Sequence, residues 1–369
     1  MPNPIQVLLV DDSAIVRGML RQILKKENDI EVIGTAANGK IGFQEYQKRN
    51  PDIVIMDIEM PEMNGIEALE LILNHDPNAK VIMCSSLTQS GASLTVKALG
   101  IGAVDCLAKP DASSIDRSKK FEEKLLRQIR AFKAQKNIIR PASVTTSQGE
   151  SKPSIYKDAP IQKKDYPATL FLSKPRIIAI GSSTGGPKAL TEVLSGIKKN
   201  PDLPPILITQ HMPAGFTKML AQTIKKECGL ECFEAEDDML VKSQTVYVAP
   251  GGKHMTVVKR TSGFFIELNE DPPVNFCRPA VDVMFDSVLE AYGSNILALI
   301  LTGMGNDGEA ASKRLIDHSS NNLLIAQDEV TSVVWGMPGA VAHAGVCHSV
   351  LPLGLIANAV NSILIGQKP

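Results

Sequence analysis

The sequence contains few aromatic residues, no excess of either charge and no long hydrophobic stretch. Its 39 Lys and Arg residues nearly balance 40 Asp and Glu residues, so no basic field points to nucleic acid or to an anionic membrane surface. No apolar run approaches the length of a membrane span, and the first residues lack the charged and apolar regions of a secretory signal. We therefore expect a soluble protein of the cytoplasm.

The cysteines lack the CxxC spacing that is typical of zinc and redox sites. Most of them lie within apolar stretches, which favours small, buried and reduced side chains. There are six of them, at positions 84, 106, 228, 232, 277 and 347. The sequence therefore predicts neither a disulfide framework nor a structural zinc site.

What the chain does have is enough length, 369 residues, and enough apolar content, 44%, for two domains with full-sized cores. Short apolar runs alternate with helix-period segments in residues 1–138, which predicts a doubly wound α/β domain with a parallel sheet. Its last helix carries an apolar stripe that should pack on the sheet, formed by Phe121, Leu125, Ile129 and Phe132. We expect its strands at 5–10, 30–35, 53–57, 79–84 and 103–107.

A second α/β pattern begins after a segment rich in Ser, Lys and Pro, which we interpret as a flexible linker over residues 139–174. The second domain, residues 175–369, should contain parallel strands at 177–180, 206–210, 296–301 and 323–327. Short antiparallel strands are expected at 245–248, 255–259 and 264–268, the last two joined as a hairpin.

Acidic residues and a lysine follow three strands of the first predicted sheet. Asp11 and Asp12 come after the first strand, Asp57 ends the third, and Lys109 follows the fifth. Strand ends near a topological switch point share one crevice. One such residue alone would suggest a helix cap, but the whole set implies a bound Mg²⁺ with Lys109 as counter-charge. This predicts a phosphoryl-transfer site with Asp57 as the nucleophile.

Residues 5 to about 135 resemble a response-regulator receiver domain, above all in the IVIMDIEMPEMNG segment around Asp57. The resemblance implies the strand order 2-1-3-4-5, phosphorylation of Asp57 by a histidine kinase, and a phosphate contacted by Ser85 and Lys109. It also implies that Mg²⁺ is held by Asp11, Asp12, Asp57 and the backbone carbonyl of Glu59. The sequence departs from the family pattern at Cys106, where receivers usually carry a switch aromatic.

A serine follows the first strand of the second domain in a tight, glycine-rich turn, GSSTGGP, at 181–187. The G-x-S-x-G spacing predicts a strand-turn-helix elbow that exposes the Ser183 hydroxyl beside the free amides of a helix N-terminus. A phosphate-binding loop has similar glycine spacing, but Pro187 and Lys188 stand where that loop needs Lys and Ser or Thr. We therefore favour a nucleophile over a phosphate loop.

A base and an orienting carboxylate also follow predicted parallel strands. His211 comes directly after the strand at 206–210, and Asp307 lies in the glycine-rich turn after 296–301. His254, near the predicted hairpin, is the competing base or a cleft contact. His75, His318, His343 and His348 are interpreted as structural.

Five segments outside the receiver resemble the chemotaxis methylesterase family of bacteria. In chain order they are GSSTGGP, ITQHMPAGF, YVAPGGKHM, PPVNFCRPAVD and LTGMGNDG. The resemblance implies an esterase that demethylates chemoreceptor glutamates and deamidates receptor glutamines without a cofactor in its hydrolase domain. It further implies Ser183, His211 and Asp307 as the triad, with the backbone amides of Thr184 and Met304 as oxyanion donors.

Two alternatives remain at this point. The second domain could be a partner-binding module without enzymatic activity, or an esterase for another acylated protein or small ester. We also expect the unphosphorylated receiver to pack over the triad cleft and phosphorylation to loosen that contact.

Overall fold

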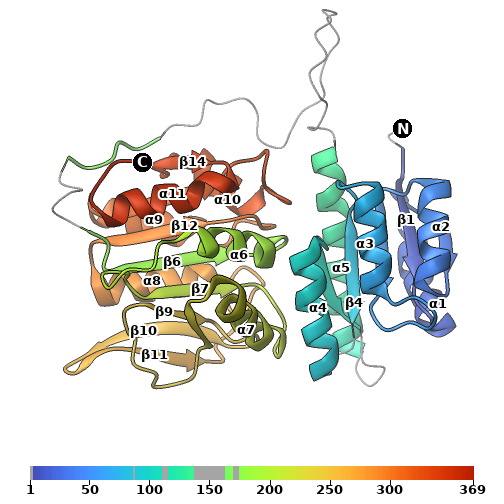
Figure 1. The fold of residues 1–369 in the computed structure, drawn as a ribbon, viewed down its shortest axis with the longest axis horizontal. Helices are drawn as coiled ribbons and strands as arrows, with labels where there is room; N and C mark the ends of the chain where they lie inside the picture. The colour runs from blue at the N-terminus through green and yellow to red at the C-terminus, as the bar shows by residue number, and fades with distance from the viewer. Residues whose placement is uncertain (1–2, 86–87, 110–114, 137–162, 169–173) are drawn as a thin grey trace, which may run out of the picture.

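The computed structural model describes residues 3–85, 88–109, 115–136, 163–168 and 174–369, which form two α/β units side by side (Figure 1). Most of the predicted linker lies outside the described residues. Its described part, 163–168, lies on the second unit, where the backbone N–H of Lys164 donates to the carbonyl of Cys347 at 2.8 Å. Tyr166 Oη and Ser349 Oγ share a hydrogen bond of 2.8 Å.

The first unit has a five-stranded parallel sheet in the order β2-β1-β3-β4-β5. This confirms the predicted doubly wound fold and its strand order. The strands are β1 (Ile5–Val10), β2 (Ile30–Ala36), β3 (Ile53–Asp57), β4 (Val81–Ser85) and β5 (Asp105–Ala108). The helices are α1 (Ala14–Lys25), α2 (Gly39–Arg49), α3 (Gly65–His75), α4 (Gln89–Ile101) and α5 (Ile115–Lys136).

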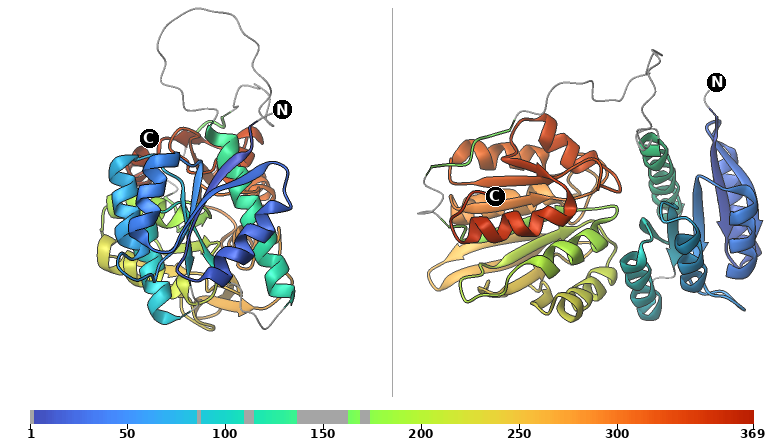
Figure 2. Two further views of the ribbon diagram at one scale, coloured as in Figure 1. Left: turned by 90° about the vertical axis from the view of Figure 1, so that its right-hand side faces the viewer. Right: turned by 45° about the horizontal axis from the view of Figure 1, so that its top comes forward.

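The first sheet is covered on both faces, as a parallel sheet requires. Helices α1 and α5 pack on one face, and the predicted stripe from Phe121 to Phe132 is buried there. Helices α2, α3 and α4 cover the other face. Helix α4 also contacts α6 (Gly186–Gly196) and α7 (Phe216–Cys228) of the second unit. The two sheets therefore meet through a helical layer, which Figure 2 shows from two further sides.

The second unit is built on a seven-stranded sheet in the order β14-β13-β12-β6-β7-β9-β8. Helices α6, α7 and α11 pack on one face, whereas α8, α9, α10 and the β10-β11 hairpin pack on the other. The strands are β6 (Ile177–Ser182), β7 (Ile206–Gln210), β8 (Glu231–Glu234), β9 (Thr245–Val248), β10 (His254–Arg260), β11 (Gly263–Asn269), β12 (Ile296–Ile300), β13 (Leu323–Gln327) and β14 (Ser349–Leu351). The helices are α6 (Gly186–Gly196), α7 (Phe216–Cys228), α8 (Val281–Tyr292), α9 (Glu309–His318), α10 (Gly336–His343) and α11 (Leu353–Leu364).

One strand of the second unit was predicted in the wrong orientation. The hairpin of β10 and β11 is antiparallel as expected, but β9 runs parallel between β7 and β8 in the main sheet. Residues 246–248 are fully or almost fully buried there. A four-residue apolar strand contains no signal for its direction, because its partners come from distant parts of the chain. In the described part of the chain no helix is both long and apolar enough to cross a bilayer.

Candidate active site

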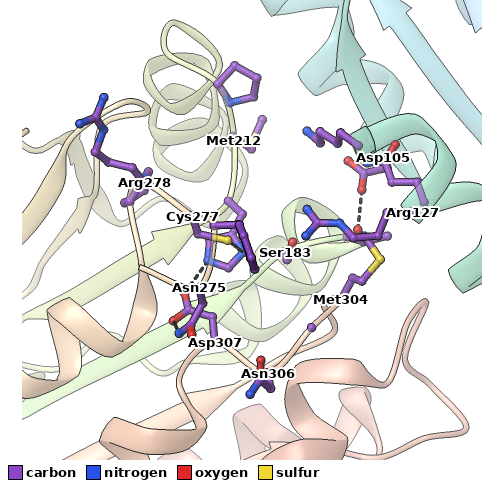
Figure 3. A pocket seen from close by; sticks show the side chains of 18 residues that line it. Asp105, Arg127, Ser183, Met212, Asn275, Cys277, Arg278, Met304, Asn306 and Asp307 are labelled. Carbon is purple, nitrogen blue, oxygen red and sulfur yellow. Dashed lines mark hydrogen bonds and ion pairs between the residues drawn. The ribbon is translucent and has the colours of Figure 1, made fainter. Parts of the chain in front are cut away.

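The three residues predicted as a triad line one pocket because their strands are neighbours. Strands β12, β6 and β7 lie next to one another in the sheet, and Asp307, Ser183 and His211 all lie beyond their carboxyl ends. The pocket has a volume of about 460 Å³ and contains all three side chains in its lining. Figure 3 shows Ser183 and Asp307 in this pocket.

His211 and Asp307 form a close pair, with 2.8 Å between Nε2 of the imidazole and Oδ2 of the carboxylate. Asp307 is only 2% exposed, yet it also accepts hydrogen bonds from the backbone N–H of Val281 at 2.6 Å and from Asn275 Nδ2 at 2.8 Å. Burial favours the neutral acid, but the donors outweigh it and hold the pKa of Asp307 below its usual value. The carboxylate is therefore ionised and fixes the imidazole.

The other imidazole nitrogen, Nδ1, faces Cys277, whose Sγ lies 3.6 Å away. Burial disfavours the imidazolium, but the contacts with Asp307 and Cys277 outweigh it and raise the pKa of His211 to about 9. Among the hydrogen bonds of the described residues none joins Ser183 to His211. Catalytic hydrogen bonds are often long or absent without substrate, so this geometry is compatible with the predicted roles of Ser183 and His211.

Gln210 stabilises the turn that carries Ser183 through two hydrogen bonds. Gln210 Oε1 accepts a hydrogen bond of 2.7 Å from Ser182 Oγ, and its amide donates to the Ser183 carbonyl at 2.9 Å. Gly185 has a φ of 77°, a left-handed conformation that a residue with a side chain rarely adopts. A Cβ on Gly185 would also lie 2.6 Å from Val333. The local geometry therefore requires glycine at position 185, the last position of the G-x-S-x-G pattern.

Two backbone amides beside Ser183 have no hydrogen-bond acceptor within the described residues. They belong to Thr184, in the turn before α6, and to Met304, in the turn after β12. Both residues line the pocket. Unused amides near a nucleophile can stabilise a developing oxyanion, which is the role expected for these two.

The first unit also contributes residues to this pocket, although the sequence did not indicate which ones. The lining includes Asp105 of β5 and three residues of α5, which are Lys124, Arg127 and Gln128. Thr184 Oγ1 donates to the Asp105 carboxylate, and the Gly185 N–H donates to the carbonyl of Val104 at 3.0 Å. The turn that carries Ser183 is therefore hydrogen-bonded directly to the first unit.

The acidic residues of the receiver meet as the sequence predicted. Carboxylate oxygens of Asp11, Asp12 and Asp57 lie within 4.8 Å of one another, and Lys109 Nζ lies 2.8 Å from both Asp11 and Asp57. Burial first and the charge of Asp11 second raise the pKa of Asp57, although Lys109 opposes them. Hard carboxylate oxygens that repel one another form a donor set that fits Mg²⁺.

Comparison with known proteins identifies a family for each of the two units. The family model of the CheB methylesterase matches residues 178–360, and that of the response regulator receiver domain matches residues 7–117. A protein-glutamate methylesterase/protein-glutamine glutaminase from Rhodospirillum rubrum is 43% identical over 96% of this chain and 94% of its own length. The chain belongs to the CheB methylesterase family. A relative of the same name from Azospirillum brasilense is 42% identical over 95% of this chain and 90% of its own length.

Solved CheB structures resemble each half separately. The catalytic domain of Thermotoga maritima CheB has 39% sequence identity and a TM-score of 0.48, covering 50% of this chain and 97% of that one. Its response regulator domain has 44% identity and a TM-score of 0.32, covering 35% of this chain and 95% of that one.

His254 does not make the cleft contact that the sequence suggested. It is 0% exposed and absent from the pocket lining. Its Nδ1 accepts a hydrogen bond of 3.3 Å from the backbone N–H of Ala280, and its Nε2 lies 3.2 Å from the carbonyl of Pro272. In this CheB family member His254 is therefore a structural residue that is hydrogen-bonded to both ends of the loop at 272–280.

That loop supplies two site residues that sequence analysis missed. Asn275 is hydrogen-bonded to Asp307, and Cys277 contacts His211. Both lie within the PPVNFCRPAVD segment, so the family motif was the available signal. Neither residue type indicates a triad contact without knowledge of its spatial neighbours.

The raised pKa of His211 predicts an alkaline pH dependence. The base accepts a proton only as neutral imidazole, so kcat/KM should rise with pH and reach half its maximum near pH 9. Cys277→Ala removes one of the contacts that stabilise the imidazolium, so the rise in kcat/KM should occur at lower pH in this variant. Methanol release measured across pH 6 to 10 tests both statements, and a flat profile through pH 9 in the unmodified chain would contradict them.

Proposed function

We propose that this protein-glutamate methylesterase and protein-glutamine glutaminase acts through a Ser183 acyl-enzyme. The Ser183 oxygen attacks the γ-carbonyl of the substrate side chain while His211 accepts the hydroxyl proton through Nδ1. Asp307 holds the imidazole through Nε2 and stabilises the imidazolium. The observation that carries this proposal is the 2.8 Å pair of His211 and Asp307 in a pocket shared with Ser183.

The remaining steps return every group to its starting state. The tetrahedral oxyanion accepts hydrogen bonds from the Thr184 and Met304 amides, and its collapse breaks the bond to the leaving group. His211 gives its proton to that group, which departs as methanol from an ester or as ammonia from an amide. Water, deprotonated by His211, then attacks the acyl-enzyme carbonyl. Collapse of this second intermediate breaks the bond to Ser183 and releases a glutamate side chain, and His211 returns its proton to the Ser183 oxygen.

For the substrate, we propose the methylated glutamates and certain glutamines on helices of chemoreceptors. Methanol release from methylated receptor membranes tests this directly. A partner-binding module without activity would give no methanol and no serine-directed labelling, because it has no reason to contain an activated hydroxyl. An esterase for other substrates would be labelled at Ser183 but would leave the receptors methylated.

For regulation, we propose that a chemotaxis-type histidine kinase provides the phosphoryl group that Asp57 accepts. Asp11, Asp12, Asp57 and the Glu59 carbonyl would hold Mg²⁺, and the ion would supply positive charge against the incoming phosphate. Ser85, 1% exposed at the end of β4, and Lys109 would contact the phosphate once it is bound.

The path from Asp57 to Ser183 runs along a single strand. Lys109, directly after β5, touches Asp57, and Asp105, the first residue of β5, accepts the hydrogen bond from Thr184. Cys106 between them is buried, and burial raises the pKa of its thiol to about 12, so it acts as a neutral packing residue. We infer that a phosphoryl group at Asp57 draws Lys109 to itself and shifts β5, which weakens the Asp105 contact.

Replacing Asp57 with asparagine should abolish activation by a small phosphodonor such as acetyl phosphate. The amide cannot form the acyl phosphate, so the ratio of methanol release with and without the donor should fall to one. Asp52→Asn is the matched control, because Asp52 lies just before the same strand and outside the acidic pocket. Continued stimulation of the Asp57→Asn chain would place the phosphorylation site elsewhere.

A further inference from the structure

The loop between β11 and α8 contains a tight turn with an unusual residue. The backbone N–H of Cys277 donates to the carbonyl of Val274 at 2.8 Å, and the reverse hydrogen bond is 3.1 Å long. The two central residues, Asn275 and Phe276, have φ angles of 51° and 62°. Left-handed φ at both central positions is the mark of a type I′ turn.

Asn275 suits such a turn, but Phe276 does not. The second central position favours glycine, and a bulky residue with positive φ is a conformational outlier. Burial of the ring does not compensate for this, because Phe276 is 92% exposed. Backbone strain of this kind clusters at functional sites, so the exposed ring is a candidate for contact with another molecule.

The position of Phe276 points to the active site. Its neighbour Asn275 donates to Asp307, and its other neighbour Cys277 lies against His211; Figure 3 shows both residues at the pocket. Phe276 itself lines the pocket that contains Ser183, and Val274 adds a second apolar side chain that is 36% exposed. The turn thus holds an apolar projection at the rim of the reaction site.

The substrate of the proposed function must cross this rim. A glutamate side chain is short, so a helix that delivers its ester to Ser183 lies on the pocket mouth, and the helix is about 10–12 Å wide. Side chains three and four residues away occupy the same helix face as the ester. An apolar one among them would come to lie at the rim and could cover the ring.

We infer that Phe276 is a substrate anchor that binds an apolar side chain on the ester-bearing face of a receptor helix. This inference rests on the proposed function and names a recognition element for the same site. The ring is exposed even though receiver residues line the same pocket, so docking of the receptor can precede displacement of the receiver.

The test replaces Phe276 with asparagine, which keeps the left-handed turn and removes the ring. KM for methylated receptor membranes should rise about tenfold with kcat retained, since losing burial of a phenyl group has roughly that effect. Relief of strain should raise Tm by about 2–4 °C. Phe276→Leu keeps an apolar side chain, so its KM should stay close to that of the unmodified protein. Val330→Ala shortens an 82% exposed apolar side chain outside the pocket and should leave the KM unchanged.

Binding is measured separately from turnover, by co-sedimentation of the Ser183→Ala chain with receptor membranes. Adding Phe276→Asn to that chain should weaken sedimentation about tenfold. Equal sedimentation with and without the ring would overturn the anchor, as would an unchanged KM or the absence of any sedimentation. If the unmodified chain binds receptors but releases no methanol, the proposed reaction fails and the sedimentation comparison still decides on the anchor.

Discussion

Replacing Ser183 with alanine should lower methanol release from methylated receptors by at least about 1000-fold, because no acyl-enzyme can form without the hydroxyl. The oxyanion amides and His211 would remain in place, and they alone give only a small residual rate. The measurement is methanol release per enzyme, with thermal unfolding recorded to verify that the variant is folded.

The neighbouring serine provides the matched control. Ser182 is fully buried and donates its hydroxyl proton to Gln210, so Ser182→Ala should cost about 1 kcal/mol of stability through one lost buried hydrogen bond. It should nevertheless retain turnover. A folded Ser183→Ala chain with the turnover of the unmodified protein would show that the nucleophile is a different group.

Removing the receiver, residues 1–140, should raise the basal rate on receptors. The coupling free energy between regulatory and active sites in proteins corresponds to about a 5- to 150-fold change, and we expect an increase within this range. The physical reason is that Asp105, Lys124, Arg127 and Gln128 line the pocket with Ser183. Methanol release by the truncated and full chains, each without phosphodonor, gives the ratio.

A point variant tests the same idea in the full chain, where α4 still packs on α6 and α7. Asp105→Ala removes the acceptor of the Thr184 hydroxyl and should raise the basal rate in part. Glu31→Ala, an exposed carboxylate on β2 at the opposite sheet edge, is the control and should leave the rate unchanged. Equal activity with and without the receiver, at every level of phosphorylation, would exclude an inhibitory receiver.

Most of the candidate site residues could be predicted from the sequence, because the ends of buried strands are recognisable in it. The apolar runs that became β1, β3, β7 and β13 have the predicted bounds. In a parallel sheet every strand delivers its carboxyl end to the same edge. Asp57 and Lys109 therefore had to meet in one crevice, and Ser183, His211 and Asp307 followed the same rule in the second sheet.

Properties that depend on distant partners could not be predicted in this way. The direction of β9 is set by β7 and β8, and His254 is structural because the loop at 272–280 folds over it. The roles of Asn275 and Cys277 likewise follow from where that loop docks. None of these contacts leaves a period or a local motif in the chain.

The sequence by itself therefore determined two α/β domains, an acidic pocket and a serine elbow, since hydrophobic periodicity and turn residues are local properties. Only the tertiary structure decided that Asp105 is hydrogen-bonded to Thr184, that α5 residues line the pocket around Ser183, and that Phe276 projects from a strained turn beside it. These features arise where surfaces distant in the chain pack together, and shape and hydrogen-bond complementarity between such surfaces exist only in the folded molecule.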